Sequence, residues 1–99
     1  MTDSEISKAL ALAIGWRDDN VHVIRGAVFV DVWSGPVVHN YRKLDYRDWN
    51  VIGPIAEKYN AFPKYGGPLM GWECWIEDGY AHADTPQKAI ALAVIGAKK

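Results

Sequence analysis

Residues 72–97 read WECWIEDGYAHADTPQKAIALAVIGA, and this stretch decides the fold. Its second half predicts a helix, because Thr85 can serve as N-cap, Pro86 suits the first helical position, and apolar residues recur on one face. The apolar positions are Ala89, Ile90, Ala93, Val94 and Ala97. Its first half predicts two strands joined by a turn, residues 77–79, that contains a glycine. A hairpin followed by a helix docked by one face indicates an α+β domain.

A second hairpin is predicted nearer the start of the chain. Two valine-rich runs, residues 21–24 and 27–33, flank Arg25-Gly26, which has the composition of a tight turn. Pairing Ile24 with Ala27 places Val21, Val23, Val28, Val30 and Val32 on one face, which we expect to be core. The other face is mixed and carries His22, Ile24, Ala27, Phe29, Asp31 and Trp33. We expect residues 37–41 to form a short edge strand or an extended loop.

Two more helices are predicted from apolar residues at helical spacing. The first covers residues 4–14, with Asp3 or Ser4 as cap and Gly15 as its end. The second covers residues 48–59 with Trp49 on its inner side, and a proline inside it implies a late start or a kinked first turn. Residues 60–71 are expected to be an irregular loop. The predicted order is α-β-β-α-β-β-α, with helices packed on one mostly antiparallel sheet.

Length and composition favour a single domain over residues 1–99, since 49% of the residues are hydrophobic. The net charge of −1 offers no obvious attraction for nucleic acid. The lone Cys74 cannot close an internal disulfide, which indicates a reducing compartment. The first residues lack the basic segment of a signal peptide, and no run approaches the ~20 apolar residues of a membrane span. We therefore expect a cytoplasmic protein that binds neither membrane nor nucleic acid.

Several landmarks resemble the phage ABA sandwich domain family, a group of small bacteriophage proteins. They are Ile14-Gly15-Trp16, Leu44-Asp45, Asp48-Trp49-Asn50, Gly71-Trp72, and Ala83-Asp84-Thr85-Pro86-Gln87 leading into residues 89–93. The sequence departs from that pattern at Leu44 and Tyr46, where a phenylalanine and a proline would be expected, and by the proline within the second helix. The resemblance implies a phage or prophage origin and a compact αβ sandwich, and it supplies no activity.

The residues able to carry chemistry favour structural roles. Cys74 alternates with Trp72 and Ile76 on the face expected to be buried, where a cysteine behaves as a small hydrophobe. The three histidines, His22, His39 and His82, lack the spacing of zinc ligands. We therefore predict no metal, no cofactor and no catalytic residue.

Three other groups of residues also favour structural roles over chemistry. His22 and Asp31 are near-diagonal neighbours in the first hairpin, a pairing that can tune a general base but more often is a surface pair. Asp45 and Asp48 precede a helix, which favours capping over acid–base catalysis. Gly66, Gly67 and Gly71 match no phosphate-binding fingerprint, so we expect no nucleotide site.

Aromatic residues are the one feature above background, with five tryptophans and five tyrosines. They can fill a small core or form a docking surface. Trp75 alternates with Glu73 and Glu77 on one face of its strand, so either a helix covers that face or Trp75 anchors a partner. We predict that Trp75, with Trp33 and Tyr80, contributes to a partner-binding or self-association surface.

Three functions from different classes follow. The favoured one is a non-catalytic, phage-encoded accessory protein that binds and modulates another protein, such as a host defence or metabolic factor. The alternative is a small-ligand-binding domain with its pocket between the sheet and the 60–71 loop. The third is an enzyme, which would need a polar constellation assembled from distant segments.

Overall fold

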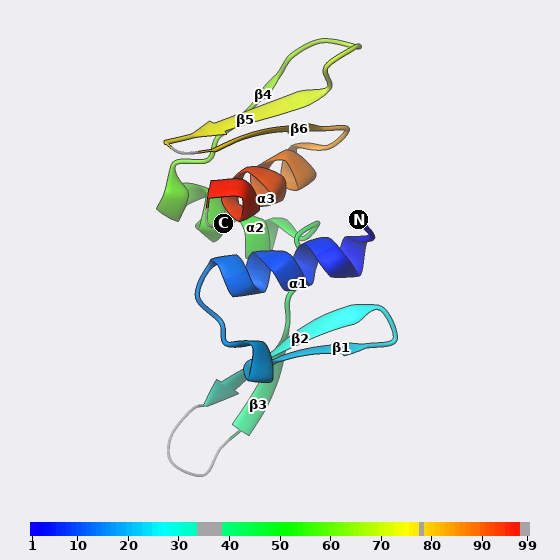
Figure 1. The fold of residues 1–99 in the computed structure, drawn as a ribbon, viewed down its shortest axis with the longest axis vertical. Helices are drawn as coiled ribbons and strands as arrows, with labels where there is room; N and C mark the ends of the chain where they lie inside the picture. The colour runs from blue at the N-terminus through cyan, green and yellow to red at the C-terminus, as the bar shows by residue number, and fades with distance from the viewer. Residues whose placement is uncertain (34–38, 78, 98–99) are drawn as a thin grey trace.

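The computed structural model describes residues 1–33, 39–77 and 79–97, without the side chains of Trp33 and His39. Two small sheets form the two ends of an elongated molecule measuring 49 × 27 × 23 Å, and the three helices lie between them (Figure 1). The α+β class is confirmed. The single sheet and the predicted order are wrong, because the order is α-β-β-β-α-β-β-β-α over two three-stranded sheets.

Sheet A is an antiparallel meander of β1 (Val21–Ile24), β2 (Ala27–Trp33) and β3 (His39–Lys43). The predicted hairpin and its register are confirmed, since Ile24 pairs with Ala27. The valine face packs on the helix layer, except that Val23, close to the turn, is 47% exposed. The predicted segment 37–41 begins outside the described residues, and the described strand runs on to Lys43.

Sheet B is a second antiparallel meander of β4 (Pro63–Tyr65), β5 (Trp72–Ile76) and β6 (Gly79–Ala83). The loop predicted over residues 60–71 is therefore wrong in part, because it contains β4. Gly79 lies in β6 opposite Ile76 and not in the turn. A Cβ atom on Gly79 would lie 2.7 Å from the carbonyl oxygen of Ala93. Only glycine allows this close approach of strand and helix.

The first helix, α1 (Asp3–Ala13), is capped by Thr2 and not by Asp3 or Ser4. Thr2 and Glu5 form a capping box: the Thr2 hydroxyl accepts from the Glu5 amide, and the Glu5 carboxylate accepts from the Thr2 amide. The predicted end is confirmed, since Gly15 has φ +111° and the next amide bonds back into the last turn. A short 3₁₀ turn, η1 (Asp18–Asn20), leads from α1 into sheet A.

The second helix, α2 (Trp49–Tyr59), begins at Trp49 and therefore without the late start that its proline implied. Pro54 lies within the helix and is exposed. Asp48 caps it by accepting a hydrogen bond from the Asn50 amide at 2.9 Å. Trp49 does not lie on the inner side as predicted. It is 50% exposed, because in the first turn only the side that contains Ile52 meets the core.

The third helix, α3 (Pro86–Ala97), is the centre of the core. It lies between sheet B and α1, and so its apolar residues are buried on several sides (Figure 1). They are Ala89, Ile90, Ala91, Ala93, Val94 and Ile95. Thr85 caps it as predicted, accepting from the Lys88 amide at 3.2 Å. In the described parts of the chain, none of the helices has the length and apolar character of a membrane span.

Candidate partner-binding surface

The outer face of sheet B points away from the helix layer (Figure 1). Its centre is an aromatic pair: Trp75 on β5 lies directly opposite Tyr80 on β6, with ring centroids 4.2 Å apart. Trp75 is 61% exposed and Tyr80 is 42% exposed. The predicted phase of β5 is therefore confirmed, because Cys74 faces the helices and Trp75 faces outward.

Polar groups frame this pair on the same face. The Tyr80 hydroxyl donates to the Glu73 carboxylate at 2.9 Å, and this hydrogen bond raises the pKa of Tyr80. His82 lies opposite Glu73, with its ring 6.2 Å from that of Tyr80. Because Tyr80 is hydrogen-bonded to Glu73 and its ring contacts that of Trp75 at an interplanar angle of 44°, the pair is partly pre-ordered before any partner arrives.

Trp33 does not join this surface. It belongs to β2 in sheet A, at the opposite end of the molecule from Trp75 and Tyr80 (Figure 1). The backbone of Trp33 pairs with His39, and both side chains lie outside the described residues. Of the three predicted surface residues, the structure brings two together.

The outer face of sheet A carries the His22–Asp31 pair predicted from the hairpin register. The imidazole Nε2 lies 3.1 Å from a carboxylate oxygen of Asp31, and the ring meets Tyr41 edge-on at 5.7 Å. A shallow cavity of about 240 Å³ adjoins them, lined otherwise by Ile24 and Phe29. Such a pair can hold an imidazole in one orientation, but no serine, threonine or cysteine lines this described cavity to act as a nucleophile.

Cys74 is buried as predicted, with no exposed surface, on the inner face of sheet B. Burial raises the pKa of its thiol to about 11, which disfavours the reactive thiolate at neutral pH. Within residues 1–33, 39–77 and 79–97, no three potential ligands gather into a metal-binding group.

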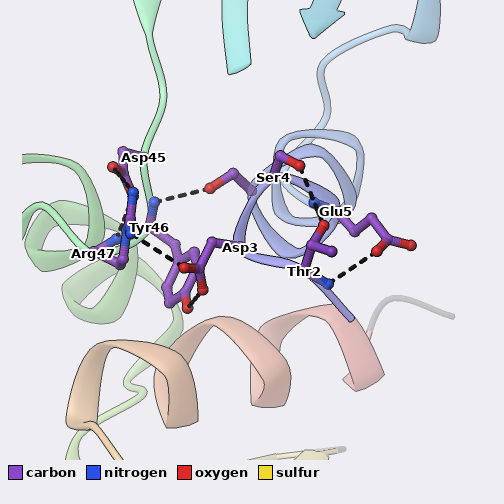
Figure 2. Close-up of polar contacts among 8 residues, drawn as sticks. Thr2, Asp3, Ser4, Glu5, Asp45, Tyr46 and Arg47 are labelled. Carbon is purple, nitrogen blue, oxygen red and sulfur yellow. Dashed lines mark hydrogen bonds and ion pairs between the residues drawn. The ribbon is translucent and has the colours of Figure 1, made fainter. Parts of the chain in front are cut away.

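A polar cluster that the sequence did not predict joins the start of α1 to the segment before α2 (Figure 2). The Tyr46 hydroxyl donates to Asp3, and the Tyr46 amide donates to the buried Ser7 hydroxyl at 3.2 Å. Burial, together with the bond to Asp3, raises the pKa of Tyr46 above its usual range. These contacts cross about 40 positions of sequence, so no local pattern could have revealed them.

Arg47 is the charged centre of the same cluster. Its guanidinium bonds Asp45 at 2.9 Å and Asp3 at 3.1 Å, and it holds the pKa of Asp45 below the usual range. Asp45 does not cap α2, because its carboxylate accepts from the backbone amide and the guanidinium of Arg47 ahead of the helix. The capping role of Asp48 is confirmed.

The described cavities lie beside sheet A and the helices, and none of them is lined by residues 60–71. Comparison of the chain with protein-family models, curated proteins and solved structures gives no match. The resemblance to the phage ABA sandwich domain family accordingly has only the sequence landmarks behind it.

Proposed function

We propose that the protein is a non-catalytic binding protein whose docking surface is the outer face of sheet B, centred on Trp75 and Tyr80. The observation that carries this proposal is the pair of Trp75 and Tyr80 rings in contact on a face that no described element covers. Exposed Trp and Tyr side chains dominate the binding energy of many protein interfaces. A large apolar side chain held at the centre of an otherwise polar face costs solubility, and recognition of a partner accounts for it.

The charges on this face favour a partner segment that presents arginine beside apolar side chains. Glu73 lies two residues before Trp75 on β5, and Glu77 lies two residues after it, just past the end of the strand. Lys64 is the one lysine or arginine on the described part of the face. The faces of indole and phenol rings attract a guanidinium group, which stacks on them more readily than an ammonium group does. A neighbouring carboxylate strengthens that attraction.

We further propose a phage or prophage origin and a partner from the bacterial host, on the basis of the sequence. The family resemblance supports a phage or prophage accessory protein, and the partner would then be a protein of the bacterial host, such as a defence or metabolic factor. The single buried cysteine supports a cytoplasmic location.

The test compares Trp75→Ala with Trp49→Ala, since both variants remove an exposed tryptophan but only the first alters sheet B. A host protein captured by the wild type should bind Trp49→Ala equally well. It should bind Trp75→Ala more weakly by about 2 kcal/mol, which is about 30-fold in Kd. Calorimetric titration of the purified partner measures this difference.

Equal binding by Trp75→Ala and the wild type would remove sheet B from the interface. Sedimentation of both proteins separates self-association from partner binding. A wild-type dimer that Trp75→Ala converts to a monomer would identify a second copy as the occupant of the face. Glu73→Gln with Glu77→Gln should weaken partner binding and reduce its dependence on salt, because carboxylate attraction is screened by ions.

A further inference from the structure

β1 is an edge strand of sheet A, because the strand order places β2 on one side of it and no described strand on the other. An edge of this kind presents unpaired backbone amides and carbonyls to which another strand can bind. Many proteins protect such an edge with a lysine, a proline or a bulge within the strand. The sequence of β1 is VHVI, and its pairing with β2 contains no bulge, so the edge lacks these protections.

The hairpin register identifies the backbone groups that face this edge. Ile24 and Ala27 close the two-residue turn as a hydrogen-bonded pair, and bonded pairs alternate with non-bonded pairs along an antiparallel ladder. The amides and carbonyls of Val21 and Val23 therefore point away from β2. The Val21 amide already donates to the carbonyl of Asp18. Val23 is thus the residue of β1 that offers both an amide and a carbonyl to a second strand.

The side chains beside these groups leave room for a second strand. Val23 lies on the inner face of sheet A and is 47% exposed, so α1 leaves much of it uncovered. Ile24 lies on the outer face and is 54% exposed. A strand placed alongside Val23 would therefore cover apolar surface on both faces of the sheet.

The charges at the two ends of β1 are opposite. Before the strand, η1 carries Asp18 and Asp19, whose side chains are largely exposed. Their ion pairs with Lys8 and Arg17, at 3.8 and 3.4 Å, lie at the surface, where such pairs contribute little. After the strand, Arg25 is exposed and forms no ion pair with any described residue. An antiparallel copy of the same strand would bring the basic end of each copy to the acidic end of the other.

We propose that β1 pairs with β1 of a second copy of this chain, antiparallel and about a two-fold axis at Val23. The two Val23 residues exchange amide-to-carbonyl hydrogen bonds, and Ile24 of each copy lies opposite His22 of the other. In this register Arg25 of each copy lies at the start of the other copy's β1, close to Asp19 in η1. The three strands of each sheet A then form one continuous sheet.

A second copy suits this edge better than an unrelated strand, because opposite charges meet at both ends of a single alignment. The interface lies at the opposite end of the molecule from the outer face of sheet B (Figure 1). It is therefore independent of the docking surface proposed there. Because β1 has only four residues, the pairing buries little surface and the dimer should be weak.

The first measurement is sedimentation of the full chain at concentrations up to about 1 mM, the range of weak complexes. We expect a reversible equilibrium between monomer and dimer. Exchange of the Val23 amide hydrogen with deuterium should slow as the concentration rises, because this amide is bonded only in the dimer. A chain that stays monomeric over the whole range, or a Val23 amide whose exchange does not change, overturns the proposal.

Val23→Pro removes the amide hydrogen that the dimer uses and that the hairpin does not. Proline is accepted in edge strands where the amide faces solvent, so the variant should fold. It should dimerise about tenfold more weakly than the wild type, because the dimer loses the two hydrogen bonds that the Val23 amides donate. Val23→Ile keeps the amide and an apolar side chain, and it should dimerise like the wild type. Equal dimerisation by Val23→Pro and Val23→Ile would overturn the pairing.

Charge reversal gives a second test that does not depend on proline. Arg25→Glu and Asp19→Lys each place like charges at both ends of the pairing, so each variant alone should dimerise about tenfold more weakly. An equimolar mixture of the two restores opposite charges at both ends and should recover the affinity as a heterodimer. Trp75→Ala should dimerise like the wild type. A mixture that stays monomeric, or a dimer that is lost in Trp75→Ala and not in the charge variants, would overturn the proposal.

Discussion

Cys74 and Trp75 are neighbours on β5, but their side chains point to opposite faces of sheet B. The thiol is packed against α3 with no exposed surface, whereas most of the indole surface is exposed on the outer face. The alternation of Trp72, Cys74 and Ile76 with the two glutamates predicted this difference, because a strand presents successive residues to opposite sides. The exposure of Trp49 could not be predicted in this way. Helical periodicity assigns residues to a face, but it does not say whether that face meets the core in the first turn.

Burial of Cys74 should lower the folding stability of the protein at alkaline pH. Its pKa is about 11 in the folded state and about 8.5 in an unfolded chain. Between these values the unfolded state loses a proton that the folded state keeps, so stability falls as the pH rises through this window. Below the unfolded pKa both states keep the proton, and the thiol adds no pH dependence.

The measurement is the free energy of unfolding of the wild type and of Cys74→Ala across that pH range. The wild type should lose more stability than the variant, because the variant has no thiol to ionise. A thiol reagent should label the native wild type slowly and the denatured chain rapidly. Rapid native labelling, or identical pH profiles for the two proteins, would contradict the buried environment of Cys74.

The element whose start is predicted best from the sequence is α3, because that start depends on neighbouring residues. The Thr85 hydroxyl accepts from the Lys88 amide, and Pro86 occupies a position that needs no amide hydrogen. Both features could be predicted because capping depends on residues next to one another in sequence. The cap of α1 was misassigned by one or two positions, since Thr2, Asp3 and Ser4 are all residues that cap helices and only the Glu5 partner distinguishes Thr2.

Replacing Thr85 with alanine should lower the free energy of unfolding by ~0.5 to 2 kcal/mol, because it leaves the Lys88 amide without its acceptor. Thr85→Ser keeps the hydroxyl and should retain most of the wild-type stability. Urea denaturation of the two variants beside the wild type measures this. An unchanged midpoint for Thr85→Ala would show that the hydroxyl does not stabilise α3.

At the scale of the whole molecule, two meanders enclose three helices and each sheet keeps one open face (Figure 1). The sequence predicted both hairpins, because a hairpin is a local structure. It did not predict two sheets. β4, the strand of sheet B outside the predicted hairpin, has only three residues and begins with a proline, so its sequence gives almost no strand signal. Separation of the two hairpins depends on packing between α1 and α3, which are far apart in the chain.

The docking surface and the polar cluster also differ in whether they depend on local structure or on long-range packing. The exposure of Trp75 and its pairing with Tyr80 follow from strand phase and hairpin register, both of which are local. The polar cluster around Tyr46 and Arg47 joins the start of α1 to the segment before α2. Its contacts cross about 40 positions of sequence, so the cluster becomes visible only in the folded chain.

The openness of sheet B's outer face is the central structural claim, and one comparison of unfolding free energies tests it most directly. Trp75→Ala should cost less than about 1.5 kcal/mol, roughly the value of its ring contact with Tyr80. Trp72→Ala, on the inner face of the same strand, should cost about 3 kcal/mol or more, because that ring packs against the core. Equal and large losses for both variants would show that Trp75 is enclosed and would contradict the docking surface.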